Sequence, residues 1–334
     1  MRIAFFGTPS LASDCLRALL CRYTVAMVVT GPDTRKGRGL RLTPSPVKRD
    51  ALGAGVPVYQ PASLPGDLPE VLDAHRVDVN VVVAYGRILP AAVIHAPRMR
   101  SVNLHASLLP RHRGPSPIEA ALLHGDTVTG LTLQLMEEAM DAGPVLAQVE
   151  IPLDEEMDAR DLYERMQALA PGFLADNLER YAAGGLVPRE QDHRAATYCS
   201  KIRKQDGWID WREPSRSVRN RIRAFALWPV AFTTLDGMLL RVHRAAPCAQ
   251  DGGVGPAPGS GKPGGGGGAG PAGGSEVPGT VLRVDRSEGV VVRTGDGCLR
   301  LLELQPENRK KMDHREFVNG YRGIQGKVLG AQKR

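Results

Sequence analysis

The sequence lacks the patterns that are typical of disulfide-rich, metal-binding, secreted and membrane proteins. Its five cysteines are scattered without a C-x-x-C spacing, so we predict neither a disulfide framework nor a metal site. No apolar run approaches a membrane span, and the first residues are not the cationic and apolar regions of a secretion signal. We therefore expect a protein of the reducing cytoplasm that acts away from the membrane, and we expect a monomer.

A dinucleotide fingerprint is also missing. The buried strand pattern Ile3-Ala4-Phe5-Phe6 leads through Gly7-Thr8-Pro9 into a helix, which is the opening of many nucleotide-binding folds. The fingerprint needs G-x-G-x-x-G at this turn, and only one glycine stands there. NAD binding is therefore not expected.

Length and charge narrow the remaining classes. The 334 residues are enough for two domains, and 42% hydrophobic content is typical of a globular protein. The formal net charge is +7, and the isoelectric point is about 9.3. This mild excess of positive charge favours contact with a polyanion, and nucleic acid is a candidate.

The first part of the chain predicts an α/β domain. Nearly continuous apolar strands alternate with helices, which is the pattern of a parallel sheet covered on both faces. The expected strands are 3–6, 25–30, 56–59, 77–84, 101–105, 131–135 and 145–151, and the expected helices are 10–20, 45–53, 68–75, 117–124 and 159–181. We predict a doubly wound, mostly parallel sheet over residues 1–190, as an N-terminal catalytic domain.

The pattern changes after residue 190. We expect a linker over 191–212, and then a domain over 213–322 that starts with a helix after Pro214. Five short strands are expected at 231–235, 238–245, 280–284, 289–294 and 298–304, which favours a small OB-like β-barrel. Residues 251–275 are almost all glycine, proline and alanine, so we interpret them as a flexible insertion, and 323–334 as a tail.

Polar side chains interrupt the apolar strand at 101–105. Because side chains alternate along a strand, Asn103 and His105 point to the same face. The following Pro110 and the turn to Gly114 place the pair near the end of the strand, where ligands bind in open α/β sheets. The alternative is that Asn103 caps a turn and His105 is an ordinary core histidine.

Asp141 is the acidic residue that fits this pair. It lies in a turn between two expected strands, and it would reach the sheet edge of His105 if those strands are neighbours. Asn, His and Asp without a serine or cysteine nucleophile fit a direct transfer to an amine. Asn103 and a protonated His105 would stabilise the oxyanion, while His105 or a water held by Asp141 takes the amine proton. The alternative is a turn aspartate that binds its own backbone.

Basic residues gather in two other places. The loop 31–47 is long for a segment without secondary structure, and such loops are often functional. Together with a helix after Pro214 it forms a basic track that favours RNA, although a solvated basic surface is the alternative. The candidate RNA-binding residues are Arg35, Lys36, Arg38, Arg41 and Lys48 in the loop and directly after it, and Arg216, Arg219 and Arg223, which are expected to share one side of the helix.

Taken together, these segments resemble the methionyl-tRNA formyltransferase family from Met1 to about Arg322, apart from the glycine-rich insertion. The resemblance depends on several dense motifs. They are Phe6-Gly7-Thr8-Pro9, Gly37-Arg38-Gly39, Leu42 to Lys48, Val82 to Gly86 with Ile88-Leu89-Pro90, Asn103 to Pro110, Met136 to Asp141 with Gly143, and Leu301 to Pro306. The chain departs from the family at Gly114-Pro115-Ser116-Pro117, where an extra proline stiffens the wall near the approach of the amine.

The resemblance implies transfer of the formyl group of 10-formyltetrahydrofolate to the amino group of initiator methionyl-tRNA, for translation initiation. It implies that Asn103, His105 and Asp141 are catalytic and that no metal takes part. It also implies that the loop with Arg38 and Arg41 contacts the tRNA acceptor end, while the barrel holds the acceptor arm. The folate site would comprise Ser107, Leu108, Leu109 and Pro110 with Tyr85, Gly86, Ile88 and Leu89.

Two alternatives remain at this point. Another folate-dependent formyltransferase, or a formyltetrahydrofolate hydrolase, could use the same Asn-x-His and distant Asp, but neither needs the basic loop. A catalytically inactive RNA-binding protein could use the same basic surfaces, but it would leave the polar strand without a role.

Overall fold

The chain folds into two units in the computed structural model, which describes residues 1–36, 41–64, 66–248 and 276–331. The first unit comprises Met1–Ala121 and Asp126–Lys201, and the second comprises Leu122–Gly125 and Ile202–Arg334. Residues 191–201, at the start of the expected linker, therefore belong to the first unit.

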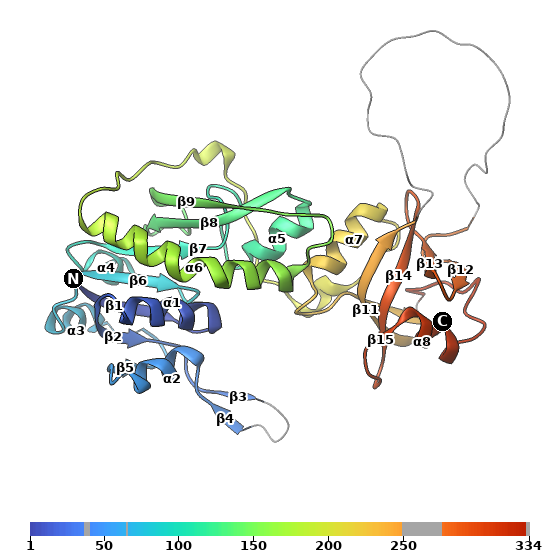
Figure 1. The fold of residues 1–334 in the computed structure, drawn as a ribbon, viewed down its shortest axis with the longest axis horizontal. Coiled ribbons are helices and arrows are strands. Elements are labelled where there is room, and N and C mark those ends of the chain that lie inside the picture. The colour runs from blue at the N-terminus through green and yellow to red at the C-terminus, as the bar shows by residue number, and fades with distance from the viewer. Residues whose placement is uncertain (37–40, 65, 249–275, 332–334) are drawn as a thin grey trace, which may run out of the picture. The chain divides into compact units, whose positions relative to one another are not determined.

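The first unit is built on a seven-stranded sheet (Figure 1). In spatial order its strands are β5 (Val58–Tyr59), β2 (Thr24–Val29), β1 (Arg2–Gly7), β6 (Val79–Val83), β7 (Ser101–His105), β8 (Val128–Leu135) and β9 (Val145–Pro152). The pairs from β5 to β7 are parallel, and β8 and β9 are antiparallel additions. This confirms the mostly parallel α/β sheet.

Helices cover both faces of this sheet. Ala4 and Phe6 of β1 share a buried cluster with apolar residues of α3 (Leu68–Ala74) and α4 (Ala91–His95). The alternating residues Ile3 and Phe5 are equally buried on the other face. The other helices are α1 (Ser10–Leu20), α2 (Pro46–Gly53), α5 (Pro117–His124) and α6 (Ala159–Ala182), and Figure 1 shows α6 running beside α1. Burial on both faces explains why the strands are continuously apolar.

The basic loop contains secondary structure that we did not expect. Thr34–Lys36 (β3) and Arg41–Thr43 (β4) form an antiparallel hairpin, which extends away from the sheet in Figure 1. Ser45 then caps α2, because its hydroxyl accepts the amide proton of Lys48 at 3.0 Å. The expectation of a structureless loop was wrong for these residues. Arg38 lies outside the described residues.

The second unit is a separate antiparallel β domain, as predicted. Its strands are β10 (Phe232–Leu235), β11 (Met238–Pro247), β12 (Val281–Asp285), β13 (Gly289–Arg293), β14 (Cys298–Pro306) and β15 (Met312–Asp313), and its helices are α7 (Ser215–Ala224) and α8 (His314–Gly320). The sheet order is β10-β11-β14-β13-β12, with β15 paired to β14. A core of buried aliphatic and aromatic side chains, including Trp211 and Phe317, fills the unit.

Part of the expected tail belongs to this domain. The amide of Gly326 donates to the carbonyl of Val281, the first residue of β12, at 2.8 Å. A few residues later, the amide of Gly330 donates to the carbonyl of Thr234 in β10 at 2.9 Å. Because β10 and β12 are the two outer strands of the sheet, this segment connects its edges.

The cysteine prediction needs a correction. Cys248 and Cys298 form a disulfide with a Cα–Cα distance of 6.0 Å. The two residues are 50 positions apart in the sequence, and they meet because β11 and β14 are antiparallel, with Pro247 opposite Leu299. Among the described residues, no group of three or more His, Cys, Asp or Glu side chains could hold a metal ion, and no helix is long and apolar enough to cross a membrane.

Candidate active site

Strand β7 presents the first two candidate residues. His105 is its last residue and is 6% exposed. Its Nε2 lies 3.0 Å from the carbonyl oxygen of His112. Since a carbonyl can only accept a hydrogen bond, Nε2 carries a proton. The other ring nitrogen, Nδ1, lies 3.6 Å from Oδ1 of Asp141, so it is the nitrogen that can exchange a proton.

Asp141 reaches this pair by a route that the sequence did not reveal. Strands β8 and β9 are neighbours, as required, but β8 is antiparallel to β7, with Asn103 opposite Gln134. The chain therefore leaves β8 near the start of β7, where the amide of Met136 donates to the carbonyl of Ser101 at 2.8 Å. The turn that follows folds back onto β7. Asp141 thus approaches from this turn rather than from the sheet edge where β7 ends.

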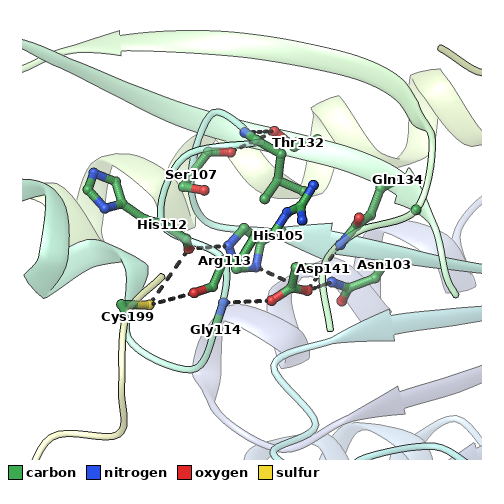
Figure 2. Close-up of polar contacts among 12 residues, drawn as sticks. Asn103, His105, Ser107, His112, Arg113, Gly114, Thr132, Gln134, Asp141 and Cys199 are labelled. Atoms are coloured by element: carbon green, nitrogen blue, oxygen red, sulfur yellow. Dashed lines mark hydrogen bonds and ion pairs between the residues drawn. The ribbon is translucent and has the colours of Figure 1, made fainter. Parts of the chain in front are cut away.

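The Asp141 carboxylate is surrounded by hydrogen-bond donors (Figure 2). Its Oδ2 accepts the amide proton of Gly114 at 2.8 Å. Its Oδ1 accepts from Nε2 of Gln134 at 3.1 Å and from Nδ2 of Asn103 at 3.4 Å. Both carboxylate oxygens of Asp141 therefore accept hydrogen bonds from the surrounding main chain and side chains.

Two positions in these turns have unusual backbone conformations. Asp141 has a φ of 51°, in the left-handed region that is unfavourable for residues other than glycine. Gly114 has a φ of 119°, and a Cβ there would lie 2.2 Å from the carbonyl oxygen of Cys199. Gly114 is therefore required, because a side chain would separate the turn from Cys199 and withdraw the amide that binds Asp141.

A segment after α6, Arg189–Cys199, ties the two turns together, and we call it the strap. At one end, Arg189 and Val145 exchange main-chain hydrogen bonds of 2.7 and 2.9 Å. At the other end, the amide of Arg113 donates to Thr197 and the amide of Cys199 donates to Arg113, both at 2.8 Å. The strap therefore fixes the position of the Asp141 turn relative to the Gly114 turn.

Three polar residues of this site were missed in the sequence analysis. They are Gln134, Arg113 and Gln191, which are 1%, 2% and 6% exposed. Gln134 could have been found, because it is a polar residue within the apolar strand β8. The other two had no local signal, since their role depends on contacts between the strap and the two turns.

The surroundings favour the protonated forms of two further groups. Burial raises the pKa of the Cys199 thiol, and the negative charge of Asp141 raises it further, against the opposing effect of the hydrogen bond from the Ser116 amide. Burial also raises the pKa of Glu119. A neutral thiol is a weak nucleophile, so Cys199 is not activated for covalent catalysis.

The segments proposed to bind folate follow adjacent parallel strands, β6 and β7. Ser107 is fully buried, and its hydroxyl donates to the carbonyl of Arg111 at 2.6 Å. The hydroxyl of Thr132 donates to the carbonyl of Ser107 at 2.6 Å and accepts from the amide of Leu109 at 3.1 Å. In this group Tyr85, Leu89 and Leu109 are buried, Leu108 and Pro110 are half-buried, Gly86 is exposed, and Ile88 is 76% exposed. These hydrogen bonds fix the turn after β7, and Ile88 exposes an apolar side chain in the segment that follows β6.

The basic residues differ in accessibility. Arg35 and Arg41 are exposed on the hairpin, and Lys36 is the last residue of β3. Lys48 is half-buried, and its Nζ lies 2.8 Å from Oδ2 of Asp33.

The arginines of helix α7 differ from the expectation that they share one basic side of the helix. Arg216 is exposed and Arg223 is half-buried, but Arg219 is only 7% exposed. The three arginines therefore do not form one exposed stripe. Arg219 lies three residues before the buried Ile222, so it borders the apolar side of the helix.

Comparison with known proteins identifies the family. A formyl transferase model matches residues 1–178, and a formyl transferase C-terminal domain model matches residues 201–322. The methionyl-tRNA formyltransferase of Methylococcus capsulatus is 40% identical over 332 residues, which cover 99% of this chain and 100% of that protein. The chain belongs to the methionyl-tRNA formyltransferase family. A methionyl-tRNA formyltransferase of Sorangium cellulosum is 41% identical over 333 residues, with 99% and 100% covered.

Solved structures agree on the fold. The sugar 3N-formyl transferase WlaRD, with dTDP and 5-N-formyl-THF, has a TM-score of 0.63 at 17% identity, over 93% of this chain and 99% of that one. The N-formyltransferase of Helicobacter canadensis, in complex with folinic acid and dTDP-3-aminofucose, has a TM-score of 0.64 at 16% identity, over 91% and 98%. For a methionyl-tRNA formyltransferase family member, the site around β7 is therefore the candidate site of formyl transfer.

Proposed function

We propose that this protein transfers the formyl group of 10-formyltetrahydrofolate directly to the amino group of initiator methionyl-tRNA, which gives N-formylmethionyl-tRNA for translation initiation. Formylation of methionyl-tRNA is the activity of its family. The contact that carries the finer proposal is the one between Nδ1 of His105 and Asp141, 3.6 Å apart, beside the amide of Asn103.

The chemistry is acyl transfer. The uncharged amine attacks the formyl carbon, and the carbonyl oxygen becomes an oxyanion. Asn103 donates a hydrogen bond to this oxyanion through Nδ2, and a protonated His105 donates through Nδ1. A water held by Asp141, or His105 itself in its neutral form, takes the amine proton. The bond from the formyl carbon to the folate nitrogen then breaks, and that nitrogen receives a proton.

Two nearby groups support transfer without a covalent intermediate. The Ser107 hydroxyl donates to the carbonyl of Arg111 at 2.6 Å, so its proton is not directed to a base. Cys199 has a raised thiol pKa. A nucleophile would need a nearby base or a lowered pKa, and neither residue has one.

Folate is the proposed formyl donor because two fold neighbours hold formylated folates, 5-N-formyl-THF and folinic acid. We propose that the donor lies against Ser107–Pro110 and the exposed Ile88. The acceptor end of the tRNA would contact Arg35 and Arg41 of the hairpin, which are exposed cations suited to phosphates. Arg216 of α7 would contact the acceptor arm.

A formylation assay tests this proposal. Purified protein with 10-formyltetrahydrofolate is given initiator or elongator tRNA charged with methionine, and formylmethionyl-tRNA is measured. We expect rapid formylation of the initiator and slower formylation of the elongator. No formylation at saturating donor would refute the proposal. Equal rates with initiator and elongator tRNA would show that the protein does not select the initiator.

A further inference from the structure

We infer that Gln191 is a positioning residue for formyl transfer, which holds Asp141 in place without touching the reacting atoms; this rests on the proposed function. Gln191 lies in the strap and is 6% exposed. Its Nε2 donates to the carbonyl of Asp141 at 2.9 Å and to the carbonyl of Gly143 at 2.6 Å. One side-chain amide therefore binds the main chain of the catalytic turn at two points.

These two contacts act on an unfavourable backbone conformation. Asp141 has a φ of 51°, a left-handed geometry that is uncommon for residues other than glycine, although aspartate adopts it more readily than most. If the two carbonyls lose their donor, the turn can relax toward an ordinary conformation. The carboxylate would then move relative to His105 and Asn103.

The orientation of the Gln191 amide is fixed by Arg113. Oε1 of Gln191 accepts from Nε of Arg113 at 3.1 Å and from Nη2 at 2.7 Å. A guanidinium can only donate, so Oε1 must face it and Nε2 must face the carbonyls. Arg113 is 2% exposed, and across the described parts of the chain it has no carboxylate within ion-pair distance. Gln191 is thus an acceptor for a buried cation as well as a donor to the turn.

A third contact reaches the Asp141 carboxylate through Gln134. Nε2 of Gln191 lies 3.4 Å from Oε1 of Gln134, and Nε2 of Gln134 donates to Oδ1 of Asp141 at 3.1 Å. The two hydrogens of the Gln191 amide point to the carbonyls of Asp141 and Gly143, so the amide orients the backbone of Asp141 and, through the longer shared contact, more weakly orients one of the donors to its side chain. This dual contact distinguishes a positioning role from simple support of the strap.

The test is Gln191→Glu, which separates the two functions of the side chain. The glutamate can still accept from Arg113, now as an ion pair, so we expect the thermal midpoint to change little. Its second oxygen would face the carbonyls of Asp141 and Gly143 and repel them. We expect kcat to fall by about 10- to 100-fold, with KM for the folate donor and for methionyl-tRNA within about twofold of wild type. Gln205→Glu, at an exposed glutamine, is the matched control and should keep wild-type kcat.

A second variant keeps the test decisive if Gln191→Glu does not fold. Gln191→Met keeps a similar volume without adding charge, and it should show the same loss of kcat at a temperature where circular dichroism shows it folded. Wild-type kcat in a folded variant, or a loss confined to KM, would overturn the inference. The wild-type protein is assayed in parallel. Its failure to formylate methionyl-tRNA would count against the proposed function, whereas equal activity of wild type and variants would count only against the role of Gln191.

Discussion

The main-chain amide of Gly114 donates a 2.8 Å hydrogen bond to Oδ2 of Asp141. This contact joins the turn after β7 to the turn after β8, so the carboxylate that we propose to be catalytic is held partly by backbone. Side chains of Gln134 and Asn103 hold the other oxygen. The geometry of the site therefore depends on how the two turns meet.

Asp141→Asn should lower kcat by about two orders of magnitude or more and leave tRNA affinity nearly unchanged. The amide keeps only one oxygen, and its NH₂ group would face N–H groups that now donate hydrogen bonds to the carboxylate. Formylation kinetics and a tRNA binding titration measure the two effects. Asp236→Asn is the matched control, because Asp236 is also left-handed, with a φ of 52°, but lies on an exposed turn of the second unit. An equal loss of tRNA affinity would make Asp141 a structural residue.

His105→Ala should also lower kcat by about two orders of magnitude or more, because the variant has no Nδ1 to exchange a proton. tRNA affinity should again change little, since His105 is buried on the sheet. Steady-state formylation kinetics and tRNA titration measure the change. His95→Ala, at an exposed histidine at the end of α4, should behave as wild type. Retained turnover in the His105 variant would assign the proton transfer to another group.

Replacing Arg38 and Arg41 by alanine should weaken tRNA binding and flatten its dependence on salt. Each phosphate contact that is lost should reduce the slope of log K against log salt by roughly one unit. Binding titrations at several salt concentrations measure this slope. Arg98→Ala removes an exposed arginine that is paired with Asp78, and it should leave the slope unchanged. If the variant without Arg38 and Arg41 keeps the wild-type slope, these arginines belong to an ordinary solvated surface.

Glu119→Gln should change the pH dependence of stability. Burial raises the pKa of Glu119, so the folded state holds this proton at pH values where the unfolded chain has lost it. The stabilisation is complete below the unfolded pKa, and it is lost as the pH rises through the higher folded pKa. Glutamine does not ionise, so the variant should gain stability relative to wild type between pH 4 and pH 8.

Urea denaturation at these two pH values measures the difference. Glu307→Gln, at an exposed glutamate of the second unit, is the control and should show no such trend. A wild-type advantage that grows with pH would mean that Glu119 is stabilised in its ionised form.

Much of the fold could be predicted from local pattern. The helices over Ser10–Leu20 and Pro117–His124 were expected with these same bounds, because their apolar spacing and flanking residues are local signals. The short helix α4 and the hairpin β3–β4 were not expected, since each is too short for a periodic pattern. The Cys248–Cys298 pair was also missed, because it depends on the register of two strands far apart in sequence.

The site was predictable only in part. Asn103 and His105 were visible as polar residues that alternate within an apolar strand. Asp141 was placed near them, but by an argument that did not foresee the antiparallel direction of β8. Gln191 and Arg113 gave no signal, because a buried hydrogen bond between segments 78 residues apart leaves no periodicity in the sequence.

The position of the strap determines where two related proteins should be joined in a hybrid. It follows α6 in the sequence, yet its hydrogen bonds connect the turns of Gly114 and Asp141, and it belongs to the unit that ends at Lys201. A chimera that joins this first unit to the second unit of a relative should therefore be cut between Lys201 and Ile202. A junction directly after Ala182 would import a foreign strap, and with it a different residue in place of Gln191 if the relative lacks this glutamine.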